Sequence, residues 1–392
     1  MTLLPVYLLV FLVWVNRYFL GAYLRWVRGA GFDRTVDDYE PTVTVVTPMY
    51  NEGPRVARTV ESLLALDYPE EKIELVMVDD ASTDGSGAHA LAAGGGRRNF
   101  RVLRNPENLG KRLSINRAVR ESRSEIIVSV DSDVEVDPGA LRELLRRFTS
   151  PRIAAVGGRV NVANANENWL TKMQAIKYFF SYEYLKNLEK TFHSVMCLSG
   201  CLSAFRREVL VQLEPVLENR RIFGVPIKYG EDRFLTRQII KAGWETFTTL
   251  DAVCWTQAPP TLDKYFSQQL RWRRSNLVDF FGGLSHAWKL PPLVAVHYLS
   301  LFGMLISYPF VVYYNLTQDT FWDLAAFNLT ILAFFGAVYG FGVRRYPAAL
   351  RVHPLWFLAM AVVMPVTYLL CTPLALFTLD SGSWETREVG TA

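Results

Sequence analysis

Long apolar runs constrain the fold of this 392-residue chain more than any other feature. Met1–Asn16 carries no charged residue, and three later runs are also free of charge: Leu290–Gln318, Leu324–Val343 and Pro354–Leu379. A membrane-spanning helix needs about 20 apolar residues. We therefore predict an N-terminal transmembrane anchor at residues 1–28, a polar domain after it, and further membrane segments towards the C-terminus.

The first apolar run has no small-residue cleavage site and leads into Arg25 and Arg28. This pattern favours a retained anchor over a signal peptide. Together with Arg34, these cations place the end of the anchor in the cytoplasm. We therefore expect a multi-pass protein of the plasma membrane with a cytoplasmic polar domain that contacts anionic lipid. The net charge of +4 is too small to indicate a nucleic acid partner.

The C-terminal third is predicted to contain an amphipathic interface helix at 261–289 and two transmembrane helices at 290–343. The next segment, 344–379, contains Pro365 and Pro373. Proline breaks the hydrogen-bond ladder of a helix, and a break survives in a membrane only where protein or water satisfies the freed groups. We interpret this segment as a proline-broken interfacial or re-entrant element. Three full spans would then leave the tail, residues 380–392, in the cytoplasm.

Residues 29–260 alternate between strand and helix patterns and have ordinary charge density. Helical spacing extends over Arg55–Leu66 and Lys111–Ser122, and 87–98 reads as a short helix and loop. The expected strands are Thr42–Thr47, Ile73–Val78, Arg101–Leu103 and Glu125–Val130. Alternation of this kind is typical of an α/β domain with a mainly parallel sheet. Ligands of such sheets bind beyond the carboxyl ends of the strands.

Three of the expected strands end in polar clusters. These clusters are Tyr50 with Glu52, Asp79 with Asp80, and Asp131 with Asp133. One acidic turn after a strand is usually a helix cap or a solvated turn. Three clusters at the same edge of a sheet are better explained by a ligand.

The third cluster has the spacing of a metal site. Asp131 and Asp133 stand at i and i+2, where two carboxylates can share a hard cation such as Mg²⁺ or Mn²⁺ that also bridges to substrate phosphates. Lys111 could supply a compact positive charge to a phosphate. These residues together indicate a phosphate-bearing substrate.

Two further segments have a structural and a functional reading that the sequence leaves open. Cys197–Ser203 is rich in small residues, which permit either tight packing or close approach of backbone to a ligand. Glu231 and Asp232 precede an expected helix, Phe234–Ala242, and could be capping carboxylates. Either could instead be the general base that takes a proton from an acceptor hydroxyl.

Gln268, Arg271 and Trp272 are spaced at i, i+3 and i+4, which places them on one face of a helix. An arginine fork suits a diphosphate, and a flat tryptophan suits the apolar face of a sugar ring. The alternative is an amphipathic surface helix that happens to carry a tryptophan.

The order of these clusters resembles the processive family-2 glycosyltransferases: hyaluronan synthases, chitin and chito-oligosaccharide synthases, and cellulose synthases. The matching motifs run from Thr47 to Trp272. They are Pro48–Glu52, Asp79–Asp84, Asp131–Asp133, Ser199–Cys201, Gly230–Arg233 and Gln268–Trp272. The resemblance implies a GT-A type α/β fold and a UDP-sugar donor used with Mg²⁺ or Mn²⁺.

The resemblance also implies a role for each motif. On the donor side, Tyr50, Glu52 and Asp79 would hold the uridine. Lys111 would lie near the diphosphate, and Gln268 and Arg271 would hold phosphates. Asp133 would bind the metal, and Asp131 would lie close to the donor. On the acceptor side, Trp272 would stack on the sugar, Cys197, Ser199 and Gly200 would line the acceptor end, and Asp232, beside Glu231, would be the base. Trp384 and Arg387 would belong to a tail that closes over the nucleotide.

Different motifs of the chain indicate different polysaccharide products. Glu385 stands where hyaluronan synthases have glycine, and Ser199–Cys201 departs from their Ser-Gly-Pro. Gly230–Arg233 and Gln268–Trp272 look closer to chito-oligosaccharide synthases. The predicted function is membrane-embedded, processive synthesis of a GlcNAc-containing polysaccharide from UDP-GlcNAc, with UDP-GlcA as a second candidate donor. The alternatives are transfer of one sugar to a lipid carrier, and a catalytically silent sugar-nucleotide sensor.

Overall fold

The computed structural model describes residues 33–222, 224–227, 229–284, 287–318 and 320–380, together with Tyr23, Trp26 and Val27. Nearly all of the predicted anchor, and the tail beyond Asp380, lie outside these residues. The chain divides into two compact units. The sheet unit contains Arg28–Asn161 and Glu189–Gln257, and the helical unit contains Val162–Leu188 and Ala258–Leu379.

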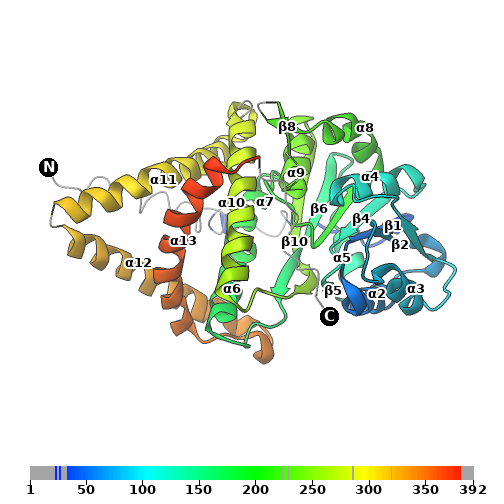
Figure 1. Cartoon of the computed structure of the whole chain (residues 1–392), viewed down its shortest axis with the longest axis horizontal. Helices are drawn as coiled ribbons and strands as arrows, with labels where there is room; N and C mark the ends of the chain where they lie inside the picture. The colour runs from blue at the N-terminus through cyan, green and yellow to red at the C-terminus, as the bar shows by residue number, and fades with distance from the viewer. Residues whose placement is uncertain are drawn as a thin grey trace. The chain divides into compact units, whose positions relative to one another are not determined.

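The sheet unit is built around an eight-stranded sheet with strand order β3-β2-β1-β4-β7-β6-β10-β5 (Figure 1). The strands are β1 Val43–Met49, β2 Ile73–Asp79, β3 Phe100–Arg104, β4 Ile126–Val130, β5 Val134–Val136, β6 Ile153–Val162, β7 Leu202–Arg206 and β10 Glu245–Thr256. A separate small hairpin pairs β8 Arg221–Ile222 with β9 Val225–Pro226. All four strands expected from the sequence are present.

The sheet is parallel in its first half and mixed in its second. β1 pairs in parallel with β2 and β4, and β2 pairs in parallel with β3. β7 is antiparallel to both β4 and β6, and β5 is antiparallel to β10. The predicted parallel sheet is therefore confirmed for β3-β2-β1-β4. Each antiparallel pair contains at least one strand, β5, β6, β7 or β10, for which the sequence showed no strand pattern.

Helices cover both faces of the sheet. They are α2 Val56–Leu64, α3 Ser86–Ala93, α4 Lys111–Glu121, α5 Ala140–Leu145, α8 Arg207–Glu218 and α9 Glu231–Lys241, with 3₁₀ turns at Gly53–Arg55 and Glu70–Lys72. Figure 1 shows α2 and α3 on one side of β1 and β2, and α4 and α8 on the other. This two-sided cover explains why β1 is buried along its whole length.

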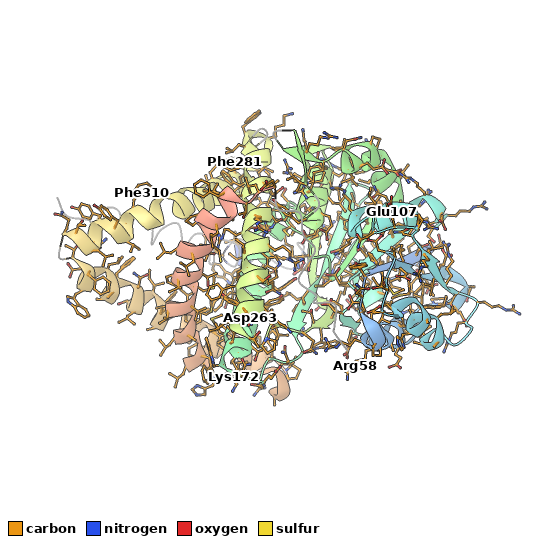
Figure 2. The ribbon with its side chains drawn as sticks, viewed as in Figure 1. Arg58, Glu107, Lys172, Asp263, Phe281 and Phe310 are labelled. Atoms are coloured by element: carbon orange, nitrogen blue, oxygen red, sulfur yellow. The ribbon has the colours of Figure 1, made fainter. Side chains whose placement is uncertain are left out.

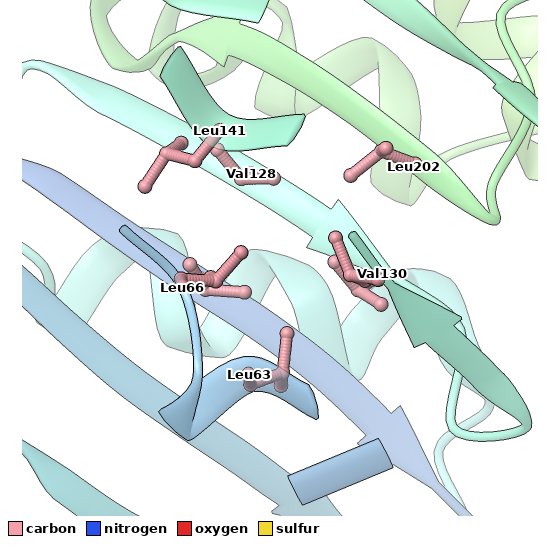
Figure 3. A pocket seen from close by; sticks show the side chains of 8 residues that line it. Leu63, Leu66, Val128, Val130, Leu141 and Leu202 are labelled. Atoms are coloured by element: carbon pink, nitrogen blue, oxygen red, sulfur yellow. The ribbon is translucent and has the colours of Figure 1, made fainter. Parts of the chain in front are cut away.

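Successive residues of the central strands supply two separate cores. Val46 and Ile127 belong to the cluster packed under α4, α8 and α9. Their neighbours Val45 and Val128 point to the opposite face, where they line a cavity of about 10 Å³ with Leu63 and Leu141 (Figure 3). Full burial of each such side chain stabilises the fold by about 1.5–3 kcal/mol. The two cores hold the strands from which the loops at the carboxyl edge extend.

The helical unit contains the predicted interface and membrane segments. Its helices are α6 Trp169–Phe180, α10 Leu262–Leu284, α11 Pro292–Thr317, α12 Phe321–Gly342 and α13 Phe357–Phe377; a π-helical turn at Ser181–Leu185 leads into α7 Lys186–Thr191, and 3₁₀ turns lie at Ala287–Lys289, Val343–Arg345, Ala348–Leu350 and Pro354–Trp356. α10 and α13 pack side by side (Figure 1). Figure 2 shows Asp263 and Phe281 near the two ends of α10.

Two helical segments among the described residues are long and apolar enough to cross a membrane, Phe321–Arg345 and Pro354–Phe377. α13 continues through Pro365 and Pro373, so the helix break expected at these prolines is absent. α13 packs against α6 and α10 along this proline-containing stretch of the helical unit. Whether this helix crosses the membrane or re-enters it stays a prediction.

Candidate active site

The three polar clusters meet at the carboxyl edge of the parallel strands. Met49 is paired with Asp79, so β1 and β2 end level with each other. Glu52 is buried and accepts a hydrogen bond from the Ser132 hydroxyl, which joins the first cluster to the third. Tyr50 is partly exposed beside them. The predicted convergence of the clusters is therefore a feature of the structure.

Asp79 and Asp80 have different roles although they are adjacent. Asp79 is 1% exposed, and its Oδ2 lies 3.4 Å from Arg104 Nη1. Asp80 points to the loop before α4, where its carboxylate accepts hydrogen bonds from the backbone N–H groups of Leu109 at 2.9 Å and Gly110 at 2.7 Å. Asp80 thus fixes the loop that directly precedes Lys111.

Lys111 is the centre of the site. Its Nζ lies 2.5 Å from Asp131 Oδ1 and 2.8 Å from Glu231 Oε1, and its side chain is 8% exposed. Burial alone would lower the pKa of Lys111, but the charges of Asp131 and Glu231 outweigh it and raise that pKa well above its usual value. Lys111 is therefore a permanent cation that holds two of the predicted site residues together.

Gly200 lies against this cluster. A Cβ atom at Gly200 would stand 2.5 Å from Lys111 Nζ and 3.4 Å from Asp131 Oδ1. Only a residue without a side chain leaves Lys111 in its place. This close approach accounts for the glycine at position 200 of the small-residue segment.

Asp232 is in the first turn of α9, directly after Glu231. Gly230 precedes the helix with a φ of 65°, in the left-handed region that favours glycine. Asp232 Oδ1 accepts a hydrogen bond from the Arg233 N–H at 2.8 Å, and Cys197 Sγ donates to Oδ2 at 3.8 Å. Burial and the adjacent charge of Glu231 raise the pKa of Asp232, while Arg233 and Lys111 oppose the shift. A carboxylate with a raised pKa suits proton transfer near neutral pH.

The segment around Cys197, Ser199 and Gly200 is tied to α9 by hydrogen bonds. The Leu198 N–H donates to Thr236 Oγ1 at 3.1 Å, and that hydroxyl donates to the Asp232 carbonyl at 2.7 Å. The predicted acceptor-end residues and the predicted base therefore form one structural group.

Two arginines that the sequence did not single out hold the loop before α9. Arg220 Nη1 donates to the carbonyls of Tyr229 and Gly230, and Arg112 Nη1 donates to the Ile227 carbonyl at 3.0 Å. Their partners are backbone atoms, so no motif marked these arginines in the sequence. They position the turn from which Glu231 and Asp232 project.

The carboxylates at the end of β4 fit a divalent cation that is shared with a phosphate. Asp133 is exposed and Asp131 is partly exposed. Within the described ranges, no group of three or more His, Cys, Asp or Glu side chains could hold a metal by itself. Mg²⁺ usually takes one or two carboxylates and completes its shell with water and phosphate oxygens. Asp131 and Asp133 match that donor set.

The predicted face of Gln268, Arg271 and Trp272 lies on α10 in the helical unit, with all three side chains partly exposed. Behind it, Lys177 Nζ donates to Gln269 Oε1 at 2.8 Å and lies 5.2 Å from the centroid of the Trp272 ring. Lys177 was not predicted, because nothing in the sequence relates α6 to α10. Trp384 and Arg387 lie outside the described residues.

The chain is similar to known proteins over most of its length. A profile of the family described as glycosyltransferase-like family 2 matches residues 41–275. An N-acetylglucosaminyltransferase of Bradyrhizobium diazoefficiens is 31% identical over 366 residues, which cover 89% of this chain and 72% of the relative. A hyaluronan synthase of Streptococcus pyogenes serotype M1 is 29% identical over 362 residues, which cover 90% of this chain and 84% of the relative.

A solved structure shows the fold. It is a mannosyltransferase from Pyrobaculum calidifontis in complex with GDP-Man and Mn²⁺, and it superposes with a TM-score of 0.55 at 20% identity, covering 96% of this chain and 98% of its own. The GT-A type fold predicted from the sequence is thereby confirmed. The chain therefore belongs to glycosyltransferase-like family 2, and it is a glycosyltransferase, as the order of its motifs predicted.

Proposed function

We propose that this protein is a membrane-embedded processive β-glycosyltransferase that polymerises, and exports, a GlcNAc-containing polysaccharide such as hyaluronan or chitin from UDP-sugars. The observation that carries the proposal is the cluster of Lys111, Asp131 and Glu231 beside Asp232. Relatives named N-acetylglucosaminyltransferase and hyaluronan synthase support the sugar, and the Mn²⁺ in the mannosyltransferase structure supports a divalent cation.

Proton transfer is assigned to Asp232. As the acceptor hydroxyl attacks the anomeric carbon of the donor, Asp232 takes its proton, the bond from that carbon to the UDP oxygen breaks, and UDP leaves with inversion. Glu231 is the poorer candidate because its carboxylate is occupied by Lys111 at 2.8 Å. Glu231 instead raises the pKa of its neighbour.

The donor is proposed to lie along the carboxyl edge of the sheet. Tyr50, Glu52 and Asp79 would hold the uridine. The Lys111 ammonium has three N–H donors and uses two on carboxylates, which leaves one for a phosphate oxygen. Mg²⁺ or Mn²⁺ held by Asp133, with Asp131 close to the donor, would neutralise diphosphate charge. Gln268 and Arg271 would bind phosphate oxygens, and Trp384 and Arg387 would close over the nucleotide.

Processive elongation is assigned to Trp272 and the apolar helices. The acceptor sugar would rest on the Trp272 ring, with Cys197, Ser199 and Gly200 lining the acceptor end. α11, α12 and α13 would surround the path of the lengthening chain through the membrane. Three spans and a cytoplasmic C-terminus remain our prediction, and a tag-accessibility assay that found the C-terminus outside would contradict it.

The test uses purified protein with radiolabelled UDP-sugars, singly and in pairs, with Mg²⁺ or Mn²⁺. Label in high-mass polysaccharide is expected. A lipid carrying one sugar would support the non-processive alternative. UDP binding with no product would support the sensor alternative.

Asp232→Asn provides the control for the chemistry. This variant should bind UDP-sugar and lose transfer by about 1,000-fold or more. Since a raised carboxyl pKa means that ionised Asp232 costs stability at neutral pH, the variant should melt no lower than the wild type. Normal polymerisation by the variant would show that Asp232 is not the base.

A further inference from the structure

The helical unit contains a buried cation without an acidic partner. The Arg273 side chain on α10 is 8% exposed, and its guanidinium carbon lies 3.8 Å from the centroid of the Tyr368 ring on α13. Its Nε has no hydrogen-bond acceptor among the residues that the structure describes. No carboxylate of those residues pairs with it. A buried charge in this state is costly unless a ligand of opposite charge completes the site.

A second cation lies in the same helical unit. Lys177 Nζ on α6 contacts the neutral amide of Gln269 and the face of Trp272, and no described carboxylate pairs with it. Burial and the positive charge of Arg273 lower the pKa of Lys177 to about 8, and Tyr368 opposes the shift. The ammonium is therefore still mostly protonated at neutral pH. The two residues form an electropositive pair whose charge the described part of the unit does not balance.

We propose that Lys177 and Arg273 bind the carboxylate of an acidic sugar in the acceptor chain, so that the polymer contains uronic acid units. The inference rests on the proposed function and names its substrate class. Lys177 touches Trp272, on which the acceptor sugar would rest. A guanidinium and an ammonium together match a carboxylate through charge-assisted hydrogen bonds. A neutral GlcNAc chain would leave both cations uncompensated.

The test measures binding of two oligosaccharides of equal length to the full chain in phosphatidylcholine nanodiscs. One alternates GlcNAc and glucuronic acid, and the other contains GlcNAc alone. We expect the acidic oligosaccharide to bind about tenfold more tightly or better, because charge-assisted hydrogen bonds contribute that much. The preference should weaken as salt is added.

Substitutions test whether Lys177 and Arg273 cause the preference for the acidic oligosaccharide. Lys177→Met and Arg273→Met should each lose most of the preference and keep the affinity for the neutral oligosaccharide. Arg273→Lys, which retains the charge, should keep part of the preference and covers the case in which the methionine variant fails to fold. Lys264→Met removes an exposed cation of α10 and should behave like the wild type.

Several outcomes would overturn the inference. Equal affinity for the two oligosaccharides would do so, as would an unchanged preference in both methionine variants. A preference that disappears when phosphatidylglycerol replaces phosphatidylcholine would assign the cations to an anionic lipid headgroup instead. Long polymer from UDP-GlcNAc alone, with no stimulation by UDP-GlcA, would refute the acidic acceptor and leave the polymerase intact. No polymer from any donor would refute the proposed function itself.

Discussion

Lys111 Nζ lies 2.8 Å from Glu231 Oε1, and this contact joins the first residue of α4 to the first residue of α9. The same ammonium lies 2.5 Å from Asp131 Oδ1 at the end of β4. The residue next to the proposed base and the carboxylate two positions before the proposed metal ligand are therefore held by one side chain. The geometry of the site depends on that cation.

Lys111→Met should disrupt the site and the fold together. It would leave the Asp131 and Glu231 carboxylates close to each other without a counter-charge. We expect the free energy of unfolding to fall by about 3 kcal/mol and kcat/KM to fall by about 100-fold. Denaturant titration and initial rates measure the two effects. Arg58→Met removes an exposed cation of α2 (Figure 2) and should change neither.

The pH dependence of kcat should report Asp232. The base acts only when ionised, so activity should fall as pH falls through its pKa. Because burial and Glu231 raise that pKa, the acid limb should lie above the ordinary aspartate value of about 4. Glu231→Gln removes one of the raising charges and should move the limb to lower pH. A limb that stays in place in this variant would contradict the assignment.

Gly200→Ala should impair transfer through crowding alone. The added Cβ would stand 2.5 Å from Lys111 Nζ and would push the ammonium away from its carboxylates. We expect kcat to fall by roughly 100-fold, the effect of a small misplacement in an active site. Gly139→Ala is the matched control, because its Cβ would meet only Asp137 Oδ1 at an ordinary 3.5 Å. Equal rates in the two variants would show that Gly200 is not required for close approach.

The parallel half of the fold, and the meeting of the polar clusters at one edge of the sheet, could be predicted from the sequence. β-branched runs such as Thr42–Thr47 mark buried strands, and polar residues at their ends mark the ligand edge. The contact of Lys177 with Gln269 could not be predicted, because it joins residues 92 positions apart through packing of two helices. The role of Arg220 could not be predicted either, because this side chain binds backbone carbonyls, which no sequence motif marks. The continuous helix through Pro365 was missed because proline inside a helical pattern predicts a break.

The preference for an acidic acceptor should depend on the charge of Lys177. Its pKa of about 8 means that the ammonium is charged below this pH and neutral above it. Arg273 supplies a second positive charge in the same unit, and Tyr368 lies beside it. The affinity ratio for acidic over neutral oligosaccharide should therefore fall as pH rises from 7 to about 9. Lys177→Arg should keep the ratio constant over that range, and a falling ratio in this variant would exclude Lys177 as the cause.

Processive elongation is the central claim, and a pulse–chase experiment tests it most directly. Purified protein would receive a short pulse of radiolabelled donor and then excess unlabelled donor, with product size followed over time. We predict that labelled chains keep growing on the enzyme in the wild type, and that Trp272→Ala releases them short while still transferring single sugars. Labelled chains that stop growing after the pulse in the wild type, or an unchanged size distribution in Trp272→Ala, would contradict the account.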